Sequence, residues 1–156
     1  MGIYEILAYF FVYGVLGWCV EVAFAAVKEG EKIILPRNVH RSAINALVVN
    51  GAIPVYVNPG VNKALGIPLG MSVKEVEKAI ENNPDAKAVF VNNPTYYGIC
   101  SDLKKVVEIA HRAGMLVLVD EAHGTHFYFG DNLPVSAMEA GADMASVSTV
   151  SYTHLT

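Results

Sequence analysis

Three short polar stretches of this sequence carry side chains that could do chemistry. They are residues 37–40 (RNVH), 93–98 (NPTYYG) and 120–126 (DEAHGTH). Each of them follows a short apolar run of the kind that forms a buried strand. Because ligands of open α/β sheets bind outside the carboxyl ends of the strands, the three stretches predict a single site at one edge of a sheet.

Each of these residue types also has a simpler interpretation. An aspartate at a strand end, such as Asp120, can cap the following turn instead of serving a site. A lone histidine such as His40 is more often a hydrogen-bonded structural residue than a catalyst. His123 and His126 are spaced like a metal-binding pair, but the sequence gives them no third ligand at a fixed spacing. Two histidines alone do not define a metal site, so we expect no metal.

The string DEAH at residues 120–123 also looks like the Walker B segment of DEAH-box helicases. In those enzymes the aspartate would hold Mg²⁺ and the glutamate would orient water. That interpretation requires an upstream GxxxxGK[ST] loop to hold phosphates, and residues 1–119 contain none. The formal charge of −4 and the scattered basic residues also give no reason to expect a nucleic-acid partner.

The segments that must position the three stretches alternate between strand and helix. Apolar runs predict strands at residues 33–35, 53–57, 88–91 and 115–119. Helical spacing and capping residues predict helices at residues 41–50, from Ser72 onward, and from Ser101 or Asp102 to Gly114, with a loop at residues 58–70. This alternation predicts an α/β fold with a partial, mostly parallel sheet flanked by helices.

The first thirty residues have a different composition. Residues 3–27 are mostly apolar and reach the roughly 20 residues that a membrane-spanning helix needs. Basic residues follow this segment and none precedes it, which places the C-terminal side in the cytoplasm. A buried core helix is the alternative, because Glu21 is costly in lipid. The sequence therefore predicts a long apolar helix before the α/β part, with possible membrane contact through residues 3–27.

The apolar segment and the α/β part resemble different families. Residues 9–30 (YFFVYGVLGWCVEVAFAAVKEG) resemble the first helix of a family of type IV ABC-transporter permease-like membrane proteins. The segments KIILPRNVHRSAINAL, GAIPVYVNP, VNNPTYYGIC and VLVDEAHGTHFYFG, in this order, resemble the major domain of Orn/Lys/Arg decarboxylases. These are pyridoxal-phosphate (PLP) enzymes of the aspartate-aminotransferase fold (fold type I). The second resemblance implies PLP as cofactor, a basic amino acid as substrate, a homo-oligomer and a cytoplasmic location for residues 31–149.

The decarboxylase resemblance also implies which residues lie around the cofactor ring. Asp120 matches the carboxylate that faces the pyridine nitrogen and keeps it protonated, so that the ring can accept electrons as CO₂ leaves. His40 matches the histidine that stacks on the ring. Ala122 matches the small residue on the other side of it.

The remaining cofactor-binding residues implied by the resemblance lie near the ring's edge or near the phosphate. Asn93 and Thr95 match a turn on the hydroxyl side of the cofactor. His123, next to the small residue beneath the ring, is expected to be a neighbour of the same ring. Ser148 matches a serine close to the cofactor phosphate.

The family pattern breaks at both ends of the matching region. After Ser148 and Thr149 the family continues into a His-Lys pair, whose lysine forms the Schiff base, whereas this chain has Val150 and Ser151. The Ser/Thr/Gly-rich loop that grips the phosphate at a helix N-terminus is replaced by the apolar segment. The sequence therefore predicts three parts: an apolar helix at residues 1–30, a decarboxylase major-domain fragment at residues 31–149, and a non-family tail at residues 150–156.

These breaks decide which functions the sequence predicts. The first hypothesis is a fusion of unrelated reading frames, with an assembly or adaptor artefact at the C-terminus. Its decarboxylase part would be inactive, because the Schiff-base lysine and the phosphate loop are missing. The alternative is a membrane-anchored α/β binding module without catalysis. The sequence does not tell whether the parent enzyme uses lysine, arginine or ornithine.

Overall fold

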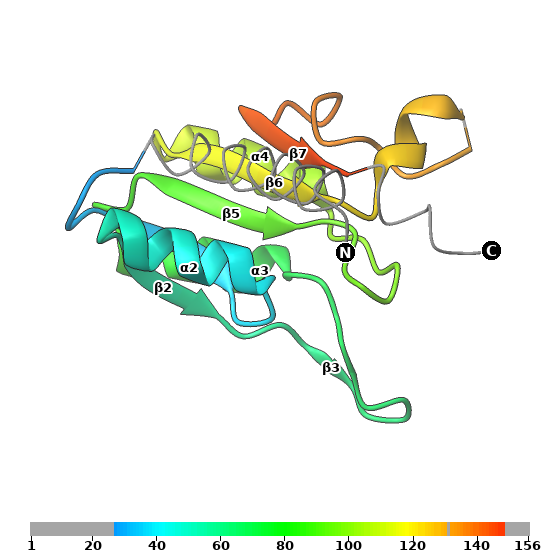
Figure 1. The fold of residues 1–156 in the computed structure, drawn as a ribbon, viewed down its shortest axis with the longest axis horizontal. Coiled ribbons are helices and arrows are strands. Elements are labelled where there is room, and N and C mark those ends of the chain that lie inside the picture. Colours follow the sequence, from blue (N-terminus) through cyan, green and yellow to red (C-terminus); the bar gives the residue numbers. More distant parts are fainter. Residues whose placement is uncertain (1–26, 131, 149–156) are drawn as a thin grey trace, which may run out of the picture.

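The computed structural model describes residues 27–130 and 132–148, and its main feature is a parallel sheet. Five strands follow one another in the order β2-β1-β5-β6-β7, and every neighbouring pair is parallel. The strands are β1 (Lys32–Pro36), β2 (Ile53–Val57), β5 (Ala88–Asn92), β6 (Leu116–Glu121) and β7 (Met144–Val147). The helices are α2 (Arg41–Asn50), α3 (Val73–Asn82) and α4 (Leu103–Arg112). The predicted α/β fold with a mostly parallel sheet flanked by helices is confirmed (Figure 1).

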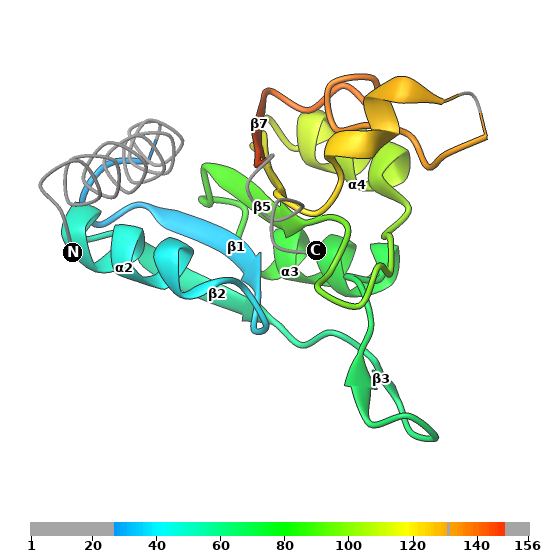
Figure 2. The same cartoon turned by 45° about the vertical axis from the view of Figure 1, so that its right-hand side comes forward.

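Helices cover both faces of the sheet. α2 packs on one face, and α3 and α4 pack on the other (Figure 1, Figure 2). Successive strand residues point to opposite faces, so Ile34 joins the core under α3 and α4 while Ile33 joins the core under α2. β6 divides in the same way, with Val117 and Val119 on the α4 side and Leu118 on the α2 side. Burial on both faces explains why these strands are continuous apolar runs in the sequence.

Side chains that cap the first turn mark where α3 and α4 begin. Ser72 Oγ accepts a hydrogen bond from the backbone N–H of Glu75 at 3.2 Å, which agrees with the predicted start of a helix at Ser72. Of the two residues predicted to cap the next helix, Asp102 does so and Ser101 does not. The Oδ1 atom of Asp102 accepts from the backbone N–H of Lys105 at 3.4 Å. These capping hydrogen bonds therefore determine where α3 and α4 begin.

The sequence analysis missed the shorter elements. β3 (Val61–Asn62) and β4 (Ile67–Pro68) form an antiparallel hairpin inside the predicted loop, and this hairpin projects away from the main sheet (Figure 2). The 3₁₀ helix η1 (Thr125–Phe129) and the edge strand β7 were also missed. Two-residue strands are too short to show a period, and no residue of β7 is fully buried. Neither case gives the apolar pattern from which strands are predicted.

The predicted long apolar helix at residues 3–27 lies outside the described residues, except for its last residue. Val27 is buried and belongs to the core on the α2 side of the sheet. Within residues 27–130 and 132–148, no helix has the length and apolar character needed to cross a membrane.

One carboxylate joins three elements at the amino end of the sheet. Asp143 lies just before β7, and its Oδ2 atom accepts a hydrogen bond from the backbone N–H of Val117 in β6 at 2.7 Å. The same oxygen lies 2.8 Å from Nε2 of His111, in the last turn of α4. Burial raises the pKa of Asp143, but the hydrogen bonds from Val117 and His111 outweigh it, so the pKa lies below its usual value.

We expect Asp143→Ala to lower the free energy of unfolding at pH 7 by about 1–2 kcal/mol, because it leaves the buried N–H of Val117 without this acceptor. A carboxyl group whose pKa is depressed by folding stabilises the protein above its usual pKa. That stabilisation is lost as the pH falls through the depressed value. Urea denaturation of wild type and variant should therefore show a gap that narrows on acidification.

The matched control for this prediction is Glu108→Gln on α4, the helix that carries His111. Glu108 forms an exposed pair with Arg112 at 4.0 Å, and such pairs contribute little. If Asp143→Ala proves as harmless as this control, the carboxylate does not join the three elements as described.

Candidate functional site

The parallel register brings the chemical stretches of three strands to the same edge. In the ladder, Asp120 pairs with Asn92 of β5 on one side and with Ser146 of β7 on the other. The backbone N–H of Asn93 donates to the carbonyl of Asp120 at 3.0 Å. β1 runs parallel to these strands and leads to His40 at the start of α2. The carboxyl ends of the strands therefore meet at one edge, where ligands of such sheets bind.

Asp120 is the half-buried carboxylate at the centre of this edge. Its Oδ1 atom accepts a hydrogen bond from the backbone N–H of Ala122 at 3.1 Å, which fixes the turn after β6. Burial raises the pKa of Asp120, while the Ala122 N–H and the charges of His40 and His123 lower it in part. Burial therefore disfavours the ionised form of Asp120. A positively charged N–H donor opposite the carboxylate would stabilise this form.

His40 has a structural role at the start of α2 and also acts on Asp120. Its Nδ1 atom accepts from the backbone N–H of Ser42 at 3.3 Å and lies 2.8 Å from the hydroxyl of Ser42, so His40 caps α2. The imidazole is exposed, and it acts electrostatically on Asp120. The structure thus shows the capping role of His40, whereas its predicted stacking on a cofactor ring stays a prediction.

Asn93 and Thr95 shape the loop after β5. Both are almost completely buried, at 1% and 2% exposure. The Oδ1 atom of Asn93 accepts from the backbone N–H of Ser101 at 2.7 Å, and the hydroxyl oxygen of Thr95 accepts from the backbone N–H of Ile99 at 3.2 Å. The roles predicted for these two residues beside a cofactor remain predictions.

His123 and Ser148 lie at the same edge, each with a neighbour that the sequence analysis did not single out. The ring of His123 meets that of Tyr96 edge to face, with centroids 5.7 Å apart. The hydroxyl of Thr125 donates to the carbonyl of Ser148 at 2.9 Å, which ties the start of η1 to the end of β7. Val150 and Ser151, on which the predicted loss of activity depends, lie outside the described residues.

The sequence analysis also gave Glu121 no role outside the helicase interpretation. This residue is completely buried, and its carboxylate accepts hydrogen bonds from the hydroxyl of Tyr128 at 2.7 Å and the backbone N–H of Ala137 at 2.9 Å. The sequence offered one signal for Glu121, its position next to Asp120. Adjacent strand residues point to opposite faces of a sheet, so this position puts Glu121 on the face away from Asp120.

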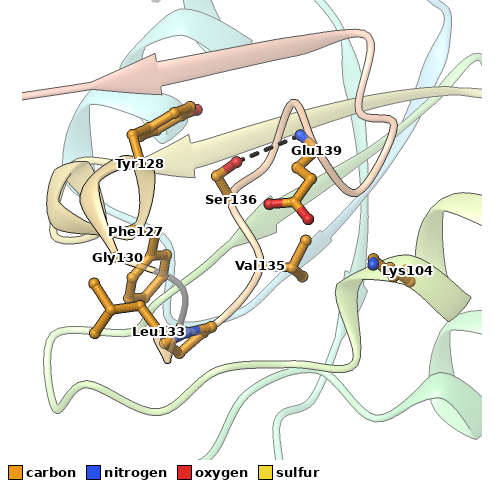
Figure 3. A pocket seen from close by; sticks show the side chains of 9 residues that line it. Lys104, Phe127, Tyr128, Gly130, Leu133, Val135, Ser136 and Glu139 are labelled. Carbon is orange, nitrogen blue, oxygen red and sulfur yellow. Dashed lines mark hydrogen bonds between the residues drawn. The ribbon is translucent and has the colours of Figure 1, made fainter.

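An open cavity of about 490 Å³ lies between α4, η1 and the segment before β7 (Figure 3). Lys104, Phe127, Tyr128, Leu133, Ser136 and Glu139 are among its lining residues. At its inner wall, the backbone N–H of Glu139 donates to the hydroxyl of Ser136 at 3.4 Å (Figure 3). Its described lining includes none of the residues predicted for the site, so the cavity is a separate feature. Across residues 27–130 and 132–148, no group of three or more His, Cys, Asp or Glu residues could hold a metal ion.

Comparison with known proteins identifies the family. The family model for the major domain of Orn/Lys/Arg decarboxylases matches residues 7–156. This chain belongs to that family. It is 50% identical over 140 residues to an arginine decarboxylase of Halalkalibacterium halodurans, covering 90% of this chain and 28% of that protein. It is 46% identical over 140 residues to an arginine decarboxylase of Bacillus subtilis, covering 90% of this chain and 29% of that protein. The decarboxylase domain seen here thus spans less than a third of the length of these relatives.

Solved structures show the same fold. A chain of the SepCysS–SepCysE N-terminal domain complex aligns with a TM-score of 0.67 at 22% identity, covering 85% of this chain and 35% of that chain. Cystalysin from Treponema denticola, whose structure contains a PLP cofactor, aligns with a TM-score of 0.57 at 16% identity, covering 69% of this chain and 27% of that chain. At these identities the likeness shows the fold alone.

The comparisons correct one interpretation of the sequence. The family match includes residues 7–30, so the resemblance of this segment to permease-like membrane proteins is not supported. The family match also argues against the helicase interpretation of residues 120–123.

PLP is the cofactor of this family, and the ring side of the site fits it. A protonated pyridine nitrogen offers the charged N–H donor that would relieve the cost of burying Asp120. Ala122 carries only a methyl group, as expected of the small residue that the family resemblance implies beside the ring. Ser148 is half-buried at the same edge, where the family resemblance places the phosphate.

We expect Asp120→Asn to stabilise the protein at pH 7, because asparagine can still accept the Ala122 hydrogen bond but carries no charge to desolvate. A carboxyl group whose pKa is raised by folding costs stability when it is ionised, and the cost disappears as the pH falls and the group takes up a proton. Urea midpoints of wild type and variant should therefore converge on acidification. A variant less stable than wild type at pH 7 would contradict this account of the carboxylate.

Proposed function

We propose that this chain carries the ring-binding part of a PLP-dependent basic amino acid decarboxylase, and that the chain itself does not decarboxylate its substrate. The observation that supports this most directly is the desolvated carboxylate of Asp120 at the end of β6, on which the charges of His40 and His123 act. When bound, PLP supplies the electron sink for loss of CO₂. In this proposal Asp120 holds the proton on the pyridine nitrogen, and His40 and Ala122 cover the two faces of the ring.

Arginine is the substrate we propose for the parent enzyme. Both relatives reported above are named arginine decarboxylases, and each matches 90% of this chain. The family as a whole also includes lysine and ornithine decarboxylases. We further propose a cytoplasmic, homo-oligomeric parent. Exposed apolar side chains on α2 and the edge strand β2 fit a larger assembly, and they include Val48, Val49 and Ile53.

Inactivity of this chain is proposed from the residues that would have to replace the family lysine. Ser151, in the expected lysine position, has no amine, and the nearest lysine before it in the sequence is Lys105. Lys105 is paired with Asp102 at the start of α4, at 2.6 Å. Lys104 lines the separate cavity. Neither lysine is placed to take over the role at the site edge.

The test uses pyridoxine 5′-phosphate, which lacks the aldehyde and needs no lysine to bind. We expect its addition to shift the NMR signals of the His40 and His123 imidazoles. Asp120→Asn should weaken its binding by about tenfold or more, since a hydrogen bond to a charged group contributes about 1.5–3 kcal/mol. Exposed Asp85 lies at the opposite end of the sheet, paired with Lys32, so Asp85→Asn is the control and should bind as wild type does.

The second part of the test concerns turnover. Wild-type protein with PLP should release no CO₂ from arginine, lysine or ornithine above the level of PLP alone. Release above that level would refute the inactive-fragment proposal. Equal binding by wild type and Asp120→Asn would instead refute the ring-binding site.

A further inference from the structure

Glu121 lies directly behind the proposed site, on the opposite face of the sheet. Asp120 and Glu121 are neighbours in β6, so their side chains point to opposite faces. Leu118 shares the face of Asp120 and packs with α2, whereas Val119 shares the face of Glu121 and packs with α4. Glu121 therefore cannot touch a ligand bound against Asp120, and any effect on the site must pass through the backbone.

The carboxylate of Glu121 joins two segments that follow β6. One oxygen accepts from the hydroxyl of Tyr128 in η1, and the other accepts from the backbone N–H of Ala137 before β7. Burial raises the pKa of Glu121, and these two donors and the nearby His126 lower it in part. Burial and the bond to Glu121 raise the pKa of Tyr128 to about 12. A buried carboxylate with both oxygens hydrogen-bonded is a rigid anchor, because either bond is costly to break without a replacement.

The turn that carries Ala122 and His123 closes directly over the side chain of Glu121. The backbone N–H of Gly124 donates to the carbonyl of Glu121 at 2.9 Å. A Cβ atom on Gly124 would lie 2.6 Å from Cγ of Glu121 and 2.8 Å from Cδ of Pro94, so only glycine fits here without a shift. The position of this side chain therefore sets the path of the turn.

We propose that Glu121 is a positioning residue for the cofactor-facing turn at residues 120–123, held from behind by Tyr128 and Ala137. The inference rests on the proposed function only in taking Asp120, Ala122 and His123 as the residues that face the cofactor. Glu121 fixes the backbone after β6. This backbone keeps the carboxylate of Asp120 buried and hydrogen-bonded to the Ala122 N–H. The same turn holds the ring of His123 against Tyr96.

The test compares Glu121→Ala, Glu121→Gln and Tyr128→Phe in the full chain without cofactor. Glu121→Ala removes both hydrogen bonds, and Tyr128→Phe removes one and keeps the charge. Glu121→Gln removes the charge, yet its amide can still accept from Ala137 and bond to Tyr128. Glu139→Gln is the control, because Glu139 is an exposed carboxylate on the wall of the neighbouring cavity.

Two NMR measurements report on the turn. The first is the titration of the Asp120 carboxyl carbon, whose midpoint in wild type should lie above the usual range. We expect Glu121→Ala to move this midpoint down toward the usual range, because a loosened turn lets water reach Asp120. The second is the contact between the rings of His123 and Tyr96, which should weaken in the same variant. Tyr128→Phe should give a smaller change in both, and Glu121→Gln and Glu139→Gln should stay close to wild type.

Three results would overturn the proposal. A folded Glu121→Ala protein with an unchanged Asp120 titration would show that Glu121 only adds stability. Equal shifts in Glu121→Ala and Glu121→Gln would show an effect of charge and not of position. If Glu121→Ala fails to fold, a Tyr128→Phe protein with an unchanged Asp120 titration and an unchanged His123–Tyr96 contact decides against the proposal. Because no cofactor is present, these results are independent of whether pyridoxine 5′-phosphate binds, so failure here is distinct from failure of the proposed function.

Discussion

The register of β5, β6 and β7 is the constraint on which the candidate site depends. In this register Asp120 lies between Asn92 and Ser146, and its side chain faces the α2 side of the sheet. A slip of one residue would turn Asp120 to the α4 side and bring Glu121 to the site face. The register is held by burial of apolar side chains on both faces, and at the amino end by the carboxylate of Asp143. Packing far from the site thus decides which of two adjacent acids can face a ligand.

The parts of this structure that the sequence predicted are those with local causes. The strand Ala88–Asn92 begins with a continuous run of buried apolar residues, and the start of α3 follows from Ser72 and Glu75. The end of α2 follows from Gly51, whose φ of 65° favours glycine. The place of Asp120 at a strand end needed only the apolar run before it. These features could be read because each depends on residues within a few positions of one another.

The parts that the sequence did not predict depend on distant partners. Glu121 bonds to the backbone of a residue sixteen positions later, and Thr125 bonds to the carbonyl of a residue twenty-three positions later. Nothing in the local pattern distinguishes such an anchor from a solvated acid or hydroxyl. β7 was missed for a related reason, because this half-exposed edge strand is defined mainly by its pairing with β6. Such features follow from the topology and become visible only when the fold is known.

The two halves of PLP chemistry act at opposite ends of the cofactor ring. A carboxylate facing the pyridine nitrogen needs a strand end, burial and a fixed turn, all of which residues 116–124 supply. In the function proposed above, the family lysine would act on the aldehyde across the ring, at the position that the resemblance assigns to Ser151. The pKa of Asp120 is raised by burial within the fold, so this shift does not depend on which residue stands at position 151. Under that proposal, the carboxylate half of the site would persist without an amine, and the cost of burying Asp120 would be measurable in the free energy of unfolding.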